Sequence, residues 1–316
     1  MTDAHDGARL WTALNGAVGR AVVGAEQPLR LMATALLADG HALVEDVPGV
    51  GKTLLARAFA RALGLGFARV QGTPDLLPSD VTGSSVLRGG AFEFIAGPIF
   101  TNVLLVDEVN RATPRTQSAL LEAMQEHQVS VDGATRPLPS PFLVLATQNP
   151  IELEGTFALP EAQLDRFLVR IGMGYPGEEA ERAIARRHRD VDEPLEDVPA
   201  VLDADELPRL RTIARRVTVS EEVERYLVRL VRATRDHPDL RLGASPRSSV
   251  ALYRAAQAWA LLDGRDFVLP DDVAALAPAV LTHRLLVDID RELRGATPQN
   301  ALAELLAGVP VGVGDA

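Results

Sequence analysis

The chain has 316 residues, 47% of them hydrophobic and 24% charged, which is typical of a globular protein long enough for two domains. Its formal net charge of −11 argues against a wrapped nucleic-acid partner, because phosphate binding needs concentrated Lys and Arg. The lack of cysteine excludes disulfides, a thiol nucleophile and cysteine-ligated zinc. The sequence has neither a signal-peptide pattern nor an apolar run of roughly 20 residues, so we expect a cytoplasmic protein without membrane insertion.

The first half of the sequence predicts an α/β core built on a parallel sheet. Residues 8–38 have a helical pattern that breaks at 22–24. Short, uniformly apolar strands are typical of a parallel sheet buried on both faces. We expect such strands at 42–44, 67–71, 103–106 and 142–146, with a helix at 54–63 after the first of them. Two hairpins, at 81–95 and 128–138, contain turn residues suited to tight connections and are interpreted as insertions.

The second half of the chain predicts helices only, and the change comes after Tyr175 and Pro176. Ser220 and Pro270 are each followed by two acidic residues, a composition typical of helix starts. Helices are expected at 178–189, 203–216, 220–236, 246–262 and 270–281. We therefore divide the chain into an α/β core at 1–174 and an all-helical domain at 175–316.

The chain contains one lysine, Lys52, while the other Lys/Arg positions all hold arginine. A compact ammonium on a thin stem fits between phosphates where the wider guanidinium fork does not. Lys52 lies in a glycine-flanked loop between a predicted strand and a predicted helix, where backbone N–H groups and the helix dipole favour anions. The expected nucleotide-binding residues here are Asp46, Val47, Pro48, Gly49, Val50, Gly51, Lys52, Thr53 and Leu54. Asp46 stands where such loops usually begin with glycine, so its charge must point away from the phosphates.

Polar groups follow the ends of two predicted strands. Asp107 and Glu108 come after residues 103–106, and Asn149 comes after 142–146. Thr53 and Asp107 would hold Mg²⁺, directly or through water, while Lys52 would reach the β- and γ-phosphates of ATP. Glu108 would polarise the attacking water as a general base does. Neighbouring strands of a parallel sheet end at one edge, which would place Asn149 near the γ-phosphate and the water.

The remaining titratable residues have simpler interpretations. None of the six His has a metal-binding spacing, and His41 and His127 are expected to be structural. Glu161 and Asp165 lie one helical turn apart and are interpreted as part of a solvated face.

Several segments together resemble the MoxR family of AAA+ ATPases. They are 73–80, 97–100, 107–112, 116–124 and 146–167, the last of which reads ATQNPIELEGTFALPEAQLDRF, and the match covers nearly the whole chain. The resemblance implies a ring-forming ATPase, typically a hexamer, with an AAA+ core at 1–174 and a helical lid at 175–316. It also implies that the two hairpins are family insertions that face the pore or the partner.

The resemblance assigns roles to further residues. Asn149 matches the sensor beside the γ-phosphate, and Arg166 matches the arginine that acts on the nucleotide of a neighbouring subunit. Arg247 resembles the second sensor, acting either in its own subunit or across the interface. Val23 and Gly24 resemble the adenine-pocket segment, although an apolar helix break explains them almost as well. Weaker candidates for the trans-acting arginine are Arg170, Arg111 and Arg115.

The predicted function is Mg²⁺-dependent ATP hydrolysis in a homo-oligomeric ring that remodels or matures a protein partner. Resemblance implies a partner with a von Willebrand factor A domain. A competing function is that of a nucleic-acid motor, against which the acidic net charge counts, as does a second hairpin with only Arg136 and nearby His127. A metal-chelatase-type ATPase subunit is a second competing function, and a scaffold that binds ATP but hydrolyses little is a third.

Overall fold

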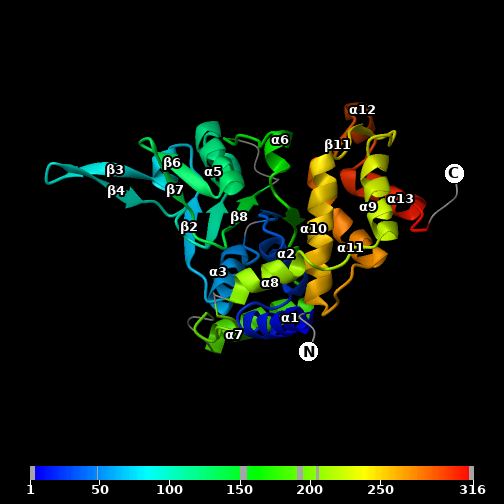
Figure 1. The fold of residues 1–316 in the computed structure, drawn as a ribbon, viewed down its shortest axis with the longest axis horizontal. Coiled ribbons are helices and arrows are strands. Elements are labelled where there is room, and N and C mark those ends of the chain that lie inside the picture. The colour runs from blue at the N-terminus through cyan, green and yellow to red at the C-terminus, as the bar shows by residue number, and fades with distance from the viewer. Residues whose placement is uncertain (1–3, 48, 150–154, 191–194, 204–205, 313–316) are drawn as a thin grey trace.

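The computed structural model describes residues 4–47, 49–149, 155–190, 195–203 and 206–312. The α/β core lies at the centre, two hairpins extend from one side of it, and a group of helices lies on the opposite side (Figure 1). Over the described part of the chain, no helix is both long enough and apolar enough to cross a bilayer.

A five-stranded parallel sheet forms the centre of the core. In spatial order its strands are β2 (Phe67–Gln71), β5 (Val103–Asp107), β8 (Leu143–Gln148), β1 (Ala42–Glu45) and β9 (Val169–Ile171). All neighbouring pairs are parallel, which confirms the predicted α/β class. Strand β9 was not predicted, because three residues with an arginine in the middle carry too weak an apolar pattern.

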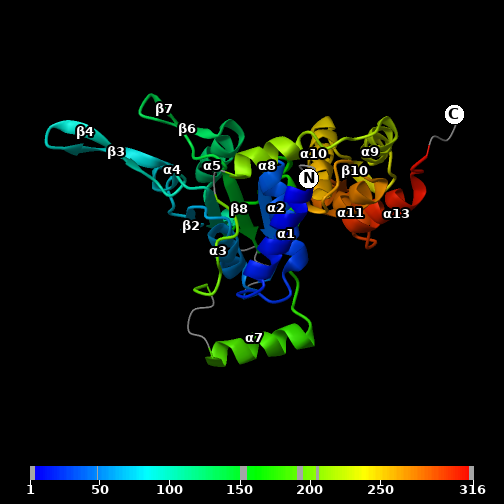
Figure 2. The ribbon, with the colours of Figure 1, turned by 60° about the horizontal axis from the view of Figure 1, so that its bottom comes forward.

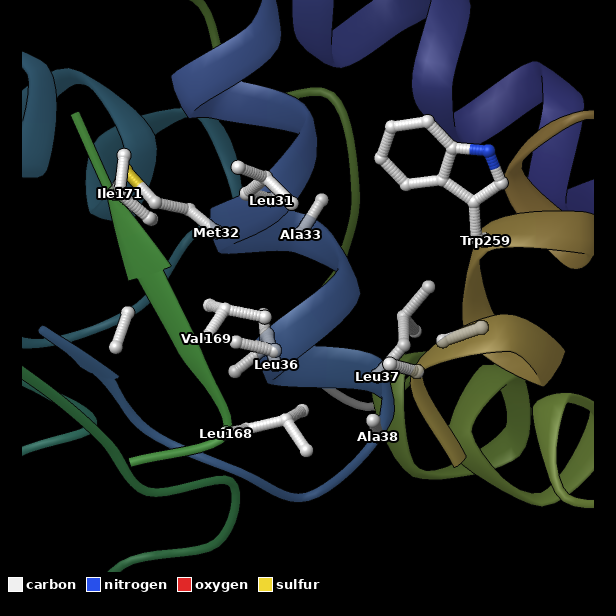
Figure 3. Close-up of a cluster of buried hydrophobic side chains, with 14 of the residues drawn as sticks. Leu31, Met32, Ala33, Leu36, Leu37, Ala38, Leu168, Val169, Ile171 and Trp259 are labelled. Atoms are coloured by element: carbon white, nitrogen blue, oxygen red, sulfur yellow. The ribbon is translucent and has the colours of Figure 1, made fainter. Parts of the chain in front are cut away.

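Each face of the sheet has its own apolar layer, because successive side chains of a strand point to opposite faces. Val103 packs in one buried cluster and its neighbour Leu104 in the other. The first cluster includes helices α1 (Ala4–Val18), α2 (Glu26–Leu37) and α3 (Lys52–Ala62), and the second includes α5 (Pro114–Glu126). Figure 3 shows α2 between β9 and the C-terminal helices, with Leu36 beside Val169 and Leu37 on the side of Trp259.

Two antiparallel hairpins project from the core on the side away from the C-terminal helices (Figures 1 and 2). The first consists of β3 (Gly83–Arg88) and β4 (Ala91–Ala96), and the second of β6 (Gln128–Val131) and β7 (Ala134–Pro137). Val81, which was predicted to open the first hairpin, belongs instead to the short helix α4 (Pro78–Thr82). Its side chain is buried in the core, which an exposed strand would not allow.

The C-terminal half is mostly helical, as predicted, but it is not all-helical because it contains one short hairpin. Its long helices are α7 (Glu178–Asp190), α8 (Glu206–Ala214), α9 (Glu221–Ala233), α10 (Pro246–Leu262), α11 (Pro270–Leu281) and α13 (Pro298–Gly308). It also contains α12 (Ile289–Glu292), the 3-10 turn η2 (Thr282–Arg284) and a hairpin of β10 (Leu240–Leu242) and β11 (Leu286–Val287). The short helix α6 (Glu161–Leu164) and the 3-10 turn η1 (Val109–Arg111) belong to the core.

Five of these helices were expected from the sequence, whereas α13 and the β10–β11 hairpin were not. Helices α8 and α10 both pack against α2, so the apolar cluster on that face continues from the sheet into the C-terminal helices. Helix α7 lies at the lower edge of the molecule in Figure 2, and its Glu181 and Ile184 line a cavity with residues 22–24. The division of the chain at 174–175 stays a prediction.

Candidate nucleotide site

The loop between β1 and α3 has the backbone geometry of a phosphate-binding turn. Gly49 and Gly51 have φ angles of 85° and 87°, in the left-handed region that favours glycine. Gly51 directly precedes α3, so the first N–H groups of that helix open toward the loop. The ammonium of Lys52 spans the loop, with Nζ donating to the Asp46 carbonyl oxygen at 2.8 Å. Pro48 lies outside the described residues.

The carboxylate of Asp46 is turned toward the chain that follows β9. Its Oδ1 accepts the Val47 N–H at 2.7 Å. Its Oδ2 accepts the N–H groups of Met173 and Gly174, the latter at 2.6 Å. Charge-assisted hydrogen bonds from backbone amides are among the stronger ones in proteins. Asp46 thus fastens the start of the loop to residues 173–174.

Two cavities meet at this loop, since Gly49, Gly51 and Leu54 line both. The first, the apolar cavity, has a volume of about 460 Å³ and is lined mostly by residues with apolar side chains and by glycines, from 21–25, 173–177 and α7. Val23 and Gly24 are among its lining residues, at the break between α1 and α2. The second, of about 430 Å³, is called the polar cavity because most of its lining residues have charged or polar side chains; it is lined by Gly49, Gly51, Lys52, Thr53, Leu54, Arg69, Gln71, Asp107, Glu108, Thr147 and Asn149. An apolar chamber joined to a polar one suits a base with its triphosphate.

The end of β5 presents two carboxylates to the polar cavity. Asp107 is buried, and its Oδ1 accepts the Thr147 hydroxyl at 3.1 Å while its Oδ2 accepts Arg69 Nε at 2.7 Å. Glu108 has a left-handed backbone, with φ 52° and ψ 51°, which is uncommon for a residue other than glycine. The strand ends at this turn, and Glu108 lines the polar cavity. Its N–H is satisfied by the Thr147 hydroxyl at 2.9 Å.

Glu108 is held from two sides. Its Oε2 accepts Gln71 Nε2 at 3.0 Å and Arg111 Nη1 at 3.0 Å. Gln71 in turn accepts Arg69 Nη2 at 3.1 Å. The two β2 residues therefore connect both carboxylates of the site into one hydrogen-bonded group.

The contributions of Arg69, Gln71 and Thr147 to the site were not predicted from the sequence. The sequence does place two of these side chains together, because Arg69 and Gln71 are two residues apart in a predicted strand and therefore lie on the same face of it. What the sequence does not reveal is that β2 pairs with β5 in a register that sets Gln71 opposite Asp107.

Lys52 and Asn149 complete the polar cavity. Burial lowers the pKa of Lys52, opposed by the nearby charges of Asp46, Asp107 and Glu108. Asn149 is buried, one residue beyond β8. β8 pairs in parallel with β5, and Asn149 lines the same cavity as Asp107 and Glu108. Its place beside the γ-phosphate and the attacking water stays a prediction.

The donor set of the polar cavity fits Mg²⁺. The Thr53 hydroxyl and the Asp107 carboxylate line the same space and offer hard oxygen ligands. The described residues contain no cluster of three His, Cys, Asp or Glu that would form an all-protein metal cage. Magnesium commonly binds through one or two protein oxygens with the rest supplied by phosphate and water, so this sparse set is sufficient.

Comparison with known proteins agrees with this geometry. Residues 41–169 match the ATPase family associated with various cellular activities (AAA), and residues 232–305 match the AAA lid domain. Chaperone MoxR1 of Mycobacterium tuberculosis is 46% identical over 92% of this chain and 80% of its own length. Protein MoxR of Methylorubrum extorquens is 36% identical over 88% of each chain. This chain belongs to the MoxR family of AAA+ ATPases.

A solved structure supports the same assignment for the fold. The crystal structure of a candidate ATPase from Cytophaga hutchinsonii superimposes with a TM-score of 0.91 at 38% identity, covering 98% of this chain and 96% of that one. As a member of the MoxR family, the protein binds nucleotide and is an ATPase.

The candidate arginines of this MoxR protein occupy different surroundings. Arg170 lies in β9 and pairs with Glu45 of β1 at 2.6 Å, within its own sheet. Arg111 pairs with Glu108 at 3.0 Å, and Arg115 is exposed in α5. Arg166 lies between α6 and β9, and its side chain forms no ion pair with any described residue. Arg247 is exposed in the first turn of α10.

Arg166 and Arg247 are not among the described residues that line the two cavities at the loop. Their roles therefore stay predictions.

The interpretation of Asp165 as part of a solvated face was wrong. Its Oδ1 accepts Nε of the buried Arg284 at 2.8 Å, and its side chain is only 16% exposed. Glu161 is exposed, as expected. The partner of Asp165 lies 119 residues away in the chain, so no local pattern could have revealed the pair.

Proposed function

We propose that this MoxR protein is a cytoplasmic homo-oligomeric ring, hexameric as the family resemblance implies, that uses Mg²⁺-ATP hydrolysis to remodel or mature a protein partner. The observation that carries the proposal is the convergence of Lys52, Asp107, Glu108 and Asn149 on one cavity beside the phosphate loop. The similarity to a protein named chaperone MoxR1 supports a protein partner. The family resemblance favours a partner with a von Willebrand factor A domain.

The chemistry follows from the polar cavity. N–H groups of the loop and of the first turn of α3 hold the phosphates, and the Lys52 ammonium binds the β- and γ-oxygens. Mg²⁺, held through Thr53 and Asp107, would supply positive charge against the phosphates. Glu108 accepts a proton from the attacking water, and Asn149 orients that water.

A neighbouring subunit completes the site. Charge that develops on the γ-phosphate needs an arginine in addition to the lysine. Arg69, which lines the polar cavity, and Arg111 are already paired with Asp107 and Glu108. Arg166 has no such partner among the described residues and does not line its own cavity, so we propose that it acts on the next subunit. Arg247 lies outside its own cavity as well, which favours the same direction for it.

The nucleic-acid motor gains no support from the hairpins. Arg136 stacks on the Phe94 ring at 3.8 Å from the ring centroid, and Arg88 pairs with Glu93 at 3.6 Å. These two are the only Lys or Arg residues of the hairpins, so the hairpins present no concentrated positive charge to a phosphate backbone.

The proposal is tested with single-site variants and their mixtures. Glu108→Gln should retain ATP binding and lose about 10²–10⁴-fold in turnover, because the phosphate contacts remain while water activation is lost. Arg166→Ala should also bind ATP without hydrolysing it, and mixing it with Glu108→Gln should restore activity at interfaces that pair an intact Glu108 with an intact Arg166. Arg225→Ala, at an exposed arginine of α9 that is not a candidate for the trans-acting residue, is the matched control and should behave as wild type.

Two results would contradict assembly into a ring. One is an ATPase rate per subunit that does not change with protein concentration down to the monomer. The other is that mass photometry detects no oligomer in the presence of ATP. For the partner, the Glu108→Gln variant should retain a bound protein from the native cell in the presence of ATP and release it without nucleotide. Failure to retain any protein in this ATP-dependent way would argue against remodelling.

A further inference from the structure

Arg284 is a buried arginine at the end of η2, in the helical part of the chain, and only 3% of its side chain is exposed. Its Nε donates to Asp165 Oδ1 at 2.8 Å. Its Nη2 donates to the Phe167 carbonyl oxygen at 2.8 Å and to that of Asp165 at 3.3 Å, and Nη1 reaches the carbonyls of Leu168, at 3.4 Å, and Val280. One guanidinium thus holds several backbone groups of the segment 165–168.

That segment carries Arg166. The carbonyls bound by Arg284 lie on both sides of Arg166 in the chain, at 165 and at 167–168. The neighbouring His283 adds a further bond, with Nε2 donating to the Phe167 carbonyl oxygen at 3.0 Å. The backbone around Arg166 is therefore fixed by two consecutive residues of the helical part.

Asp165 also connects this segment to α10. Its Oδ2 accepts the Ser245 hydroxyl at 3.3 Å, and Ser245 is the residue that precedes α10. Arg247 follows two residues later, in the first turn of that helix. One carboxylate thus joins the segment of Arg166, the turn η2 and the start of the helix that carries Arg247.

We infer that Arg284 is a positioning residue for catalysis in the neighbouring subunit: the buried Asp165–Arg284 pair holds the backbone of Arg166 in the orientation from which its guanidinium reaches the next nucleotide. This inference rests on the proposed trans action of Arg166. A displacement of a catalytic group by about 1 Å can cost on the order of 10²-fold in rate. A buried ion pair contributes little net stability against an apolar substitute but fixes one geometry, which is what a positioning role requires.

The test introduces Asp165→Asn into one or the other of the two subunits that form an active interface. In a mixture of Glu108→Gln and Arg166→Ala subunits, the Glu108→Gln subunit donates Arg166 and the Arg166→Ala subunit supplies the intact site. Adding Asp165→Asn to the donor should lower the recovered ATPase activity at least tenfold. Adding it to the Arg166→Ala subunit, which donates no arginine, should change the recovered activity by less than twofold.

A matched control comes from another buried pair of the helical part. Asp272 is 4% exposed and pairs with Arg265 at 2.6 Å, apart from residues 165–168. Asp272→Asn in the donor should leave the recovered activity within twofold. If Asp165→Asn subunits fail to fold or assemble, judged by thermal unfolding and mass photometry, Arg284→Lys replaces it in both placements with the same expectation, because a lysine keeps the charge but cannot bind several carbonyls at once.

The outcomes separate the inference from the proposal on which it rests. If the parent mixture recovers ATPase activity and then loses it equally with Asp165→Asn in either subunit, this result would show that the pair serves folding alone and would overturn the positioning role. ATPase activity that is unchanged when Asp165→Asn is in the donor subunit would overturn it as well. No recovery in the parent mixture would refute trans action by Arg166, and the inference would fall with it.

Discussion

Acid should destabilise this protein through His41, whose ring is fully buried between β1, β8 and α5. Its Nε2–H donates to the Met124 carbonyl oxygen at 3.0 Å, and its Nδ1 accepts the Val144 N–H at 3.0 Å. Both ring nitrogens are used by the neutral form, which confirms the structural role expected for this histidine. Burial lowers the pKa of His41 from 6.5 to about 4, against the opposing effect of the Met124 hydrogen bond.

The sign and size of the effect follow from this pKa. Between pH 6.5 and 4 the unfolded chain binds a proton at His41 that the folded chain does not. The contribution of neutral His41 to the free energy of unfolding is therefore complete above pH 6.5 and is lost as the pH falls toward 4. The lowered pKa corresponds to about 3 kcal/mol in total, and about 2 kcal/mol of it is lost between pH 7 and pH 5.

Urea unfolding at pH 7 and pH 5 tests the argument with three proteins: wild type, His41→Gln and the control His5→Gln, since His5 is exposed. Glutamine can still donate to Met124 but does not titrate. We expect His41→Gln to be less stable than wild type at pH 7 yet to lose about 2 kcal/mol less on going to pH 5. His5→Gln should follow wild type, and His283 contributes equally in all three. The same acid-induced loss in wild type and His41→Gln would refute the reasoning.

Three further predictions concern the nucleotide site. An amine-acylating reagent should modify Lys52 and the α-amino group of an untagged chain, and saturating Mg²⁺-ATP should protect only Lys52. Peptide mass spectrometry measures the labelling at each site. Equal Lys52 labelling with and without nucleotide would mean that the phosphates bind elsewhere. Thr53→Ala should raise the Mg²⁺ concentration for half-maximal ATPase activity on the order of tenfold, with nucleotide binding in EDTA unchanged; an unchanged Mg²⁺ requirement would remove Thr53 from the metal site. DNA or RNA should leave the ATPase rate unaltered at physiological salt, and severalfold stimulation would instead favour a nucleic-acid motor.

The parts of the site that could be predicted from sequence are those whose residues are close together in the chain. The phosphate loop is contiguous, and Asp107, Glu108 and Asn149 each follow a recognisable apolar strand. Parallel pairing then brings the strand ends to one edge without further information. This reasoning needs only local patterns and one rule about sheets.

The parts that could not be predicted depend on contacts between distant segments. Arg69 and Gln71 act on the carboxylates only because β2 is the neighbour of β5, and many strand orders would satisfy the same sequence. Arg284 reaches Asp165 across 119 residues. Strand β9 is held at the edge of the sheet by its pairing with β1 and by the packing of α2, and its three residues carry too little pattern to be found alone.

The Asp46 carboxylate has a consequence for the kinetics of nucleotide capture. By accepting three backbone N–H groups, from Val47, Met173 and Gly174, it fixes the start of the loop against the wall of the apolar cavity without any ligand contact. A loop that is ordered in advance loses less conformational entropy when the ligand arrives. Asp46→Gly would restore the usual first residue of the motif but free the loop, so we expect stopped-flow measurements to show slower ATP association in that variant. An unchanged association rate would mean that the rest of the loop is rigid on its own.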